Sequence, residues 1–147
     1  RHVIAVNKNA RRNYEILVTV EAGIELLGCE VKSIRAGGIN LKESYIRFKH
    51  NECFLVGCHI SPYKFSPLKD YDPVRDRRLL FHRHEIKRLN EQVQQKGLTI
   101  VPLRAAFSPK GRCKIEVGVG RGKKLFDKRE DIKAREAARD IERAMKR

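Results

Sequence analysis

Two histidines and a glutamate lie close together in the stretch HRHE at residues 82–85, a combination of side chains that zinc sites use. On a helix, His82 and His84 stand two positions apart and point away from each other. The HExxH pattern of metalloproteases instead spaces its histidines at i and i+4, on one face. We therefore expect no metal site here.

Three aspartates, Asp70, Asp72 and Asp76, could hold Mg²⁺ for a nuclease. The segment KDYDP also has the composition of turns, in which aspartate bonds to its own backbone. We favour turns, and a Mg²⁺-dependent RNase stays open as an alternative. GVGRGKK at 118–124 is similar to a phosphate loop, but Lys124 stands where GxxxxGK[ST] requires a hydroxyl. The sequence predicts neither an enzyme nor a bound cofactor.

The cysteines show neither a CxxC pair nor the crowding of a secreted disulfide scaffold. We expect them to be reduced and packed as small apolar side chains. They are Cys29, Cys53, Cys58 and Cys113. No long apolar run and no signal-peptide pattern is visible. These features predict a cytoplasmic protein that does not span a membrane.

The elements that must position any site are short strands and a few helices. Apolar alternation predicts strands over 14–20, 40–49, 52–60, 98–107 and 113–119, and helical spacing predicts helices over 28–38 and 82–95. The first strand runs into an EAG turn at 21–23, and a long loop covers 61–78. Without βαβ repetition, this order predicts a mainly β fold with two or three short helices. We expect an OB-like closed antiparallel barrel over residues 1–120.

Charge indicates the kind of partner. The chain of 147 residues has a formal net charge of +15 and a pI of about 10.1, far beyond what solubility requires. Residues 121–147 hold 11 Lys or Arg against 6 Asp or Glu, and residues 1–120 hold 22 against 12. Body and tail are both basic, so we expect two separate surfaces for a polyanion.

Basic residues of the body gather at 7–12, 32–35 and 75–78, with tyrosines between or near them. The tyrosines are Tyr14, Tyr45, Tyr63 and Tyr71. Any one cluster can be an ordinary solvated face. Together, cations and aromatic rings on a small barrel suit structured RNA, whose phosphates meet cations and whose unstacked bases lie on rings.

Eight stretches, in order along the chain, resemble the family of SsrA-binding proteins, also called small protein B. They are NKNAR (7–11), EAGI (21–24), GCEVKSIRAG (28–37), NLKESY (40–45), ISPY (60–63), DPVRDRRLL (72–80), KGLTIVPL (96–103) and GKKLFDKRED (122–131). Each stretch alone is a weak match. Their number and order make the resemblance highly specific.

The resemblance implies a protein that binds transfer-messenger RNA (SsrA) at its tRNA-like domain and delivers it to stalled bacterial ribosomes for trans-translation. It implies ribosome rescue without catalysis, as a monomer, with elongation factor Tu and GTP joined through the RNA. A ribosomal or ribosome-assembly protein that binds rRNA stays open as the alternative. The implied RNA-binding positions are Asn7, Arg11, Tyr14, Glu21, Leu80 and Lys114.

Of these positions, Lys114 can meet phosphate directly, Glu21 can accept a hydrogen bond from a base edge, and Leu80 can pack on a base or ribose. A plain core position is the alternative for Leu80.

For the tail, residues 121–147, the resemblance implies disorder in the free protein and a helix in the empty mRNA channel near the decoding centre. Asp127 can cap such a helix with Glu130 three residues on, and Asp131 can pair with Arg135. Phe126, among cations and without an obvious core, can stack on an rRNA base. A charged helix docked on the barrel is the alternative. The implied ribosome-binding positions are Gly122, Lys123, Lys124, Phe126, Asp127, Lys128 and Arg129.

Overall fold

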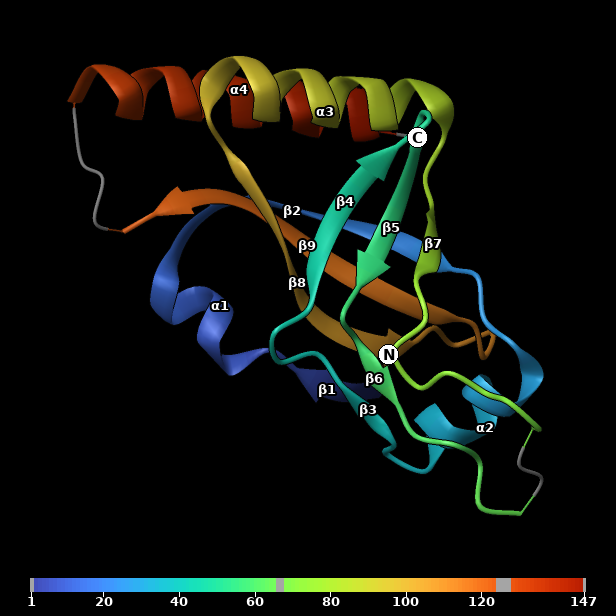
Figure 1. Cartoon of the computed structure of the whole chain (residues 1–147). Helices are drawn as coiled ribbons and strands as arrows, with labels where there is room; N and C mark the ends of the chain where they lie inside the picture. Colours follow the sequence, from blue (N-terminus) through green and yellow to red (C-terminus); the bar gives the residue numbers. More distant parts are fainter. Residues whose placement is uncertain (1, 66–67, 124–127, 147) are drawn as a thin grey trace.

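The computed structural model describes residues 2–65, 68–123 and 128–146, without the side chains of 128–131. Within these ranges the chain is mainly β, with antiparallel strands and four helices (Figure 1). In chain order the elements are β1 (His2–Val6), α1 (Lys8–Asn13), β2 (Tyr14–Ile24), α2 (Gly28–Arg35), β3 (Ile39–Asn40), β4 (Tyr45–Lys49), β5 (Glu52–Val56), β6 (His59–Ile60), β7 (Arg77–Leu80), α3 (Arg83–Lys96), β8 (Thr99–Phe107), β9 (Cys113–Gly122) and α4 (Lys128–Met145). The mainly β prediction is confirmed, α1 was not among the predicted helices, and α4 lies in the tail.

Seven strands form one sheet in the order β1-β8-β9-β2-β7-β5-β4, and β3 pairs with β6 in a second sheet. Among the described residues β1 and β4 are the two outer strands and do not pair, so the ladder is not closed into a barrel. β4 runs near β8, but a cavity of about 520 Å³ lined from α1, β4 and β8 lies at this seam. The strand pairing therefore does not confirm the expected closed barrel, and a seam without strand pairing lies between β4 and β8.

Strand β7 was not predicted, and its first two residues fall within the loop expected over 61–78. Its residues RRLL insert between β2 and β5, with Leu80 paired to Gly23 and Leu79 paired to Cys53. Arg77 and Leu79 face inward and are buried. An inward arginine breaks the apolar alternation that marks a strand, which is why the pattern did not predict β7.

Strand β2 is longer than predicted, because it continues through EAG to Ile24. Gly23 pairs across to both neighbouring strands, β7 and β9. The turn predicted at 21–23 is therefore wrong. A glycine inside a strand can instead mark the close approach of a neighbour, and this is its role here.

Helices α2 and α3 form where the sequence predicts them. In each, a glutamate of the first turn accepts a hydrogen bond from the backbone N–H of the residue at the cap. Glu30 accepts from Leu27 at 2.8 Å, and Glu85 accepts from His82 at 2.7 Å. α3 ends at Lys96, and the next residue, Gly97, has a left-handed φ of 66° that suits glycine.

The two histidines of HRHE do not point apart as predicted. His82 has extended backbone at the cap of α3, before the helix begins, and its ring stacks on that of His84 with centroids 5.7 Å apart. Within the described ranges, no group of three or more His, Cys, Asp or Glu side chains is placed to hold a metal ion.

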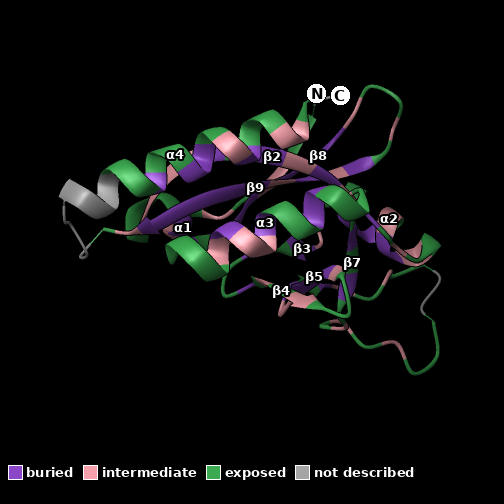
Figure 2. Cartoon of the chain, turned by 90° about the horizontal axis from the view of Figure 1, so that it is seen from above, coloured by how far each residue is buried: buried purple, intermediate pink, exposed green. Residues whose placement is uncertain are grey.

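The C-terminal tail contains α4, which lies beside α3 on one side of the sheet (Figures 1 and 2). Arg135 of α4 pairs with Glu15 of β2 at 2.9 Å. In this conformation α4 buries Ala134, Ala137, Ala138 and Ile141 against the body. The expectation that the tail is disordered in the free protein and becomes helical on the ribosome stays a prediction.

The four cysteines have free thiols. Burial raises the pKa of Cys53 and Cys58 to about 12 and that of Cys113 to about 11. These three thiols therefore stay protonated at neutral pH and pack in the apolar core, as predicted. None of the helices that the structure describes has the length and apolar character needed to cross a bilayer.

Candidate nucleic-acid interface

Cross-strand register places three residues in a row on the outer face of the sheet. Gly23 of β2 is paired with Leu80 of β7 on one side and with Lys114 of β9 on the other. Adjacent strands lie about 4.8 Å apart, so Leu80 and Lys114 stand within about 10 Å of each other. Their chain neighbours Leu79 and Ile115 are buried, which means that the row itself faces outward.

Glu21 belongs to the same outer face, because it precedes Gly23 by two residues on β2. One cavity of about 510 Å³ is lined by the row and by Glu21, together with residues of α2 and of the turn before β9. We call this cavity the outer-face hollow. It includes Glu21, Gly23, Val31, Leu80, Arg112 and Lys114. The structure thus brings together three of the six predicted RNA-binding residues.

Gly23 is a site residue that the sequence analysis missed. A Cβ built at this position would lie 3.4 Å from Cδ1 of Leu80, so a larger side chain would fill the space above the strand. The absence of a side chain between Leu80 and Lys114 helps to create the hollow. The glycine of EAGI inside an alternating strand was the available signal.

The side chains of the hollow combine charge with exposed apolar surface. Lys114 forms no ion pair with a described residue, since Glu116 on the same face of β9 is bound by Arg104 at 2.7 Å. Leu80 leaves 45% of its surface exposed, which excludes a plain core role. A cation and an apolar side chain therefore stand open to a ligand on either side of Gly23.

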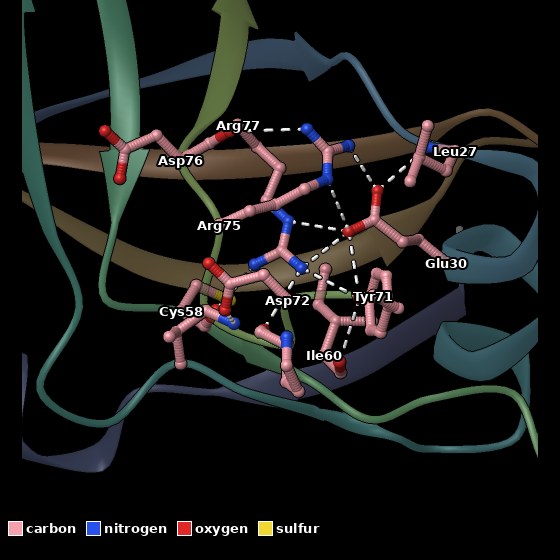
Figure 3. A network of polar contacts seen from close by, with 11 residues as sticks. Leu27, Glu30, Cys58, Ile60, Tyr71, Asp72, Arg75, Asp76 and Arg77 are labelled. Carbon is pink, nitrogen blue, oxygen red and sulfur yellow. Dashed lines mark hydrogen bonds and ion pairs between the residues drawn. The ribbon is translucent and has the colours of Figure 1, made fainter. Parts of the chain in front are cut away.

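A buried ion-pair network holds the elements that flank the hollow (Figure 3). The carboxylate of Glu30 on α2 accepts hydrogen bonds from the guanidinium groups of Arg75 and Arg77 at 2.5 to 3.1 Å. Arg77 also donates to the carbonyl of Cys58 at 2.6 Å, and the Tyr71 hydroxyl lies 3.0 Å from Glu30. One carboxylate thus ties α2 to β7 and to the loop before it.

The carboxyl group of Glu30 is ionised at neutral pH. Burial by itself raises the pKa of Glu30, but hydrogen bonds from Arg75, the Leu27 amide and Arg77 outweigh it and lower this pKa below the usual 4.5. Burial and the neighbouring Glu30 raise the pKa of Tyr71 to about 12. The hydrogen bond to Glu30 raises the pKa of Arg75. A charged carboxylate and a neutral tyrosine hydroxyl therefore take part in the network.

The same contacts revise the interpretation of the basic cluster at 75–78. Two of its arginines bind the buried Glu30, and the third pairs with Glu25 at 3.0 Å and approaches Glu52 at 3.8 Å. Tyr71, which the sequence offered as a stacking ring, also belongs to the network. This cluster therefore stabilises the fold, and its charges are largely neutralised within the protein.

Asn7 and Tyr14 lie away from the outer-face hollow. Tyr14 and Glu21 are seven residues apart on β2, a separation of about 23 Å along an extended strand. Asn7 and Tyr14 line the seam cavity between β4 and β8, and the Asn7 side-chain amide donates to a β8 carbonyl at 3.0 Å. Arg11 is exposed, and its guanidinium lies 3.9 Å from Glu116, the cross-strand partner of Glu21, so it reaches the outer face beside the hollow. Four of the six predicted residues therefore lie at the outer face, and Asn7 and Tyr14 line the seam cavity.

Two of the predicted tail positions are described in full. Gly122 ends β9, and Lys123 is exposed and donates its backbone N–H to the carbonyl of Asn13 at 3.2 Å. Lys128 and Arg129 belong to the first turn of α4, and their side chains are not described. The remaining positions, Lys124, Phe126 and Asp127, lie outside the described residues.

The three aspartates considered for Mg²⁺ have structural roles. Asp72 accepts a hydrogen bond from the backbone N–H of Val74 at 3.0 Å, and Asp76 pairs with Arg47 at 2.8 Å. Asp70 has a left-handed φ of 60°, a conformation that aspartate tolerates in turns. These contacts support the turn interpretation over a nuclease site.

A strongly basic, mainly β body with a hollowed outer face and an unpaired cation has the features of a small nucleic-acid-binding protein. Residues 4–147 match the family model described as SmpB protein. The chain belongs to the SmpB protein family, which confirms the resemblance found in the sequence.

Close relatives carry the name SsrA-binding protein. The chain is 53% identical over 146 residues to the protein of Acetivibrio thermocellus, covering 99% of this chain and 94% of that protein. It is 54% identical over 144 residues to the protein of Ruminiclostridium cellulolyticum, covering 98% and 93%. A solved structure described as "tmRNA-SmpB: a journey to the center of the bacterial ribosome" is similar with a TM-score of 0.68 and 44% identity, covering 96% of this chain and 95% of that one.

Proposed function

We propose that the chain binds the tRNA-like domain of transfer-messenger RNA and accompanies it to stalled bacterial ribosomes for trans-translation. The observation that carries this proposal is the outer-face hollow, in which Glu21, Leu80 and Lys114 meet around Gly23. These residues come from three strands, and Glu21 and Leu80 belong to two separate stretches of the family resemblance. Membership of the SmpB family and the name of its relatives support the choice of RNA.

Each residue of the hollow has a distinct role in this proposal. Lys114 meets a phosphate, since it forms no ion pair with a described residue and phosphate contacts dominate affinity for nucleic acid. Leu80 packs its exposed surface on a base or ribose. Glu21 accepts a hydrogen bond from a base edge. Because the register of β7, β2 and β9 holds these groups on rigid strands, binding requires no rearrangement of the sheet.

The N-terminal region has a supporting role. Asn7 fixes α1 to β8 through its side-chain amide, and Tyr14 contributes to the seam cavity at the same place. Arg11 is the member of this group that is open to a phosphate. We propose an OB-type architecture in which β4 and β8 face each other across this seam without strand pairing.

The tail acts on the ribosome in our proposal. Lys123 and the residues that follow it enter the empty mRNA channel of the small subunit, and α4 leaves the body as the tail binds rRNA. Phe126 stacks on a base of the decoding centre. Elongation factor Tu with GTP joins through the RNA, and the monomeric protein works in the cytoplasm by binding, without catalysis or a cofactor.

Sequencing of the RNA that accompanies the purified protein tests this function. A tagged copy is isolated from bacterial lysate, and a Lys114→Ala, Leu80→Ala variant is treated in the same way. We expect one dominant RNA with a tRNA-like end, depleted in the variant. Recovery of rRNA fragments without this species would favour a ribosome-assembly protein and contradict the proposal.

A further inference from the structure

Aromatic rings and cations gather at a place that the proposed function has not used. In the loop after β6, the rings of Tyr63 and Phe65 meet edge to face with centroids 5.7 Å apart. The ammonium group of Lys32 on α2 lies 5.7 Å from the Tyr63 ring, and that of Lys64 lies 5.9 Å from the Phe65 ring. We call these four residues the aromatic loop cluster.

The cluster faces solvent. Phe65 exposes 78% of its surface, and Leu68 farther along the loop exposes 53%. Single exposed apolar residues are common on proteins and require no explanation. Two adjoining rings flanked by two lysines are a different case, because cations and π-faces together form the surface that single-stranded nucleic acid uses.

Helix α2 connects the cluster to the outer-face hollow. Val31 lines the hollow, and the next residue, Lys32, lies against Tyr63. One turn farther along α2, the guanidinium of Arg35 lies 5.3 Å from the centroid of the Phe107 ring. The same guanidinium lies close to Gly111, which also lines the hollow, since a Cβ built on Gly111 would be 3.5 Å from it. Cations and rings therefore continue from the hollow along α2 to the loop.

We propose that the aromatic loop cluster is a stacking platform for an unpaired base of the RNA whose backbone lies in the outer-face hollow. This inference rests on the proposed function and adds to it a second contact, at Phe65. The flat ring of Phe65 takes the base, Tyr63 supports that ring from its edge, and Lys32 and Lys64 neutralise the adjacent phosphates. Structured RNA presents such bases in its loops and bulges.

The physical environment favours RNA over an apolar protein partner. Phe65 lies beside Lys64, and an apolar protein partner would have to bury the charges of Lys32 and Lys64. A polyanion instead gains from both features at once, since phosphates meet the lysines while a base covers the ring. The Glu30 carboxylate caps the start of α2, the helix that carries Lys32 of the cluster.

A single tryptophan placed in the cluster tests the inference directly. The sequence has no Trp, so Phe65→Trp provides the sole indole fluorophore. Base stacking quenches indole emission, and we expect strong quenching when the isolated tRNA-like domain is added to saturation, as judged by anisotropy of labelled RNA. Ile132→Trp is the matched control, because Ile132 is 54% exposed on α4, away from α2, and should keep its emission. Unchanged emission of Phe65→Trp at saturation would overturn the inference.

Affinity measurements separate stacking from general apolar contact. Loss of one stacked base weakens binding roughly 5- to 150-fold, so Phe65→Ala should raise Kd by this factor while leaving the melting temperature unchanged. Phe65→Leu should bind as weakly as Phe65→Ala, because it keeps apolar surface and loses the ring. Recovery of full affinity by leucine would point to an apolar contact and contradict stacking.

The same titrations distinguish the two proposals. Failure of the wild-type protein to bind the tRNA-like domain would refute the proposed function itself. Tight binding by the wild type, together with equally tight binding by Phe65→Ala, would refute only the inference about the aromatic loop cluster.

Discussion

Removal of the charge of Glu30 should destabilise the protein strongly. Glu30 and Arg77 are both fully buried, and the carboxylate is the counter-charge of Arg77 in the interior. Glu30→Gln preserves the size of the side chain but leaves the Arg77 guanidinium buried without a counter-charge. Breaking a buried pair from one side costs about 3 to 5 kcal/mol, a large part of the roughly 5 to 15 kcal/mol of a typical domain.

Urea unfolding followed by circular dichroism at pH 7 measures this loss. For a chain of this size, 3 to 5 kcal/mol corresponds to a fall in melting temperature of roughly 6 to 20 °C. Glu25→Gln is the matched control, because Glu25 also pairs with an arginine, at 3.0 Å, but at the surface. That change should cost about 0 to 1 kcal/mol.

The double variant Glu30→Gln, Arg77→Met shows whether the loss of stability arises from the interaction between these two residues. Arg77→Met removes the buried charge that Glu30→Gln leaves alone, so the two changes together should cost less than the sum of the single changes. A loss below about 1 kcal/mol for Glu30→Gln would refute the argument that buried charge holds α2 to β7. Simple additivity would show instead that the two residues act independently.

Three further predictions follow from the same geometry. The pKa of Glu30 in the folded protein lies below its usual 4.5, so ionised Glu30 contributes fully to stability above pH 4.5, and this contribution should be lost as the pH falls through the folded pKa. Urea unfolding between pH 3 and 7 should show this loss of stability in the wild type and a smaller loss in Glu30→Gln. Ile141→Ala should lower stability by about 2 to 5 kcal/mol if α4 packs in the free protein as in the structure, whereas an unchanged melting temperature would show that the tail is detached. Gly23→Val should weaken binding of the tRNA-like domain with little change in melting temperature, since its side chain would occupy the hollow beside Leu80; unaltered affinity would remove the hollow from the interface.

Local patterns account for the elements that could be predicted. Helices α2 and α3 follow from apolar spacing, from Glu30 and Glu85 in their first turns, and from glycine at their ends. The hairpin of β4 and β5 follows from alternation around His50 and Asn51, which both adopt left-handed backbone. Each of these signals is contained within a few residues, so the chain alone is sufficient to reveal them.

Long-range contacts account for most of what could not be predicted. Arg77 is acceptable inside a strand only because Glu30 neutralises it from 47 residues away, so RDRR resembled a solvated cluster and β7 resembled a loop. The seam between β4 and β8 likewise depends on the packing of whole elements.

The candidate site shows the same division. The resemblance indicated Glu21, Leu80 and Lys114 separately, but their meeting around Gly23 follows from the register of three strands, which no local pattern contains. The aromatic loop cluster depends on α2 approaching the loop after β6, and sequence analysis identified only its tyrosine and its basic stretch.

The salt dependence of RNA binding by Lys114→Ala tests the central claim most directly. The Kd for the isolated tRNA-like domain is measured at several salt concentrations for the wild type, Lys114→Ala and Lys87→Ala, a control at an exposed lysine on α3. If Lys114 meets one phosphate in the outer-face hollow, its loss should weaken binding and reduce the log-log salt slope by about one unit. Lys87→Ala should match the wild type. A slope and affinity for Lys114→Ala equal to those of the wild type would contradict the account.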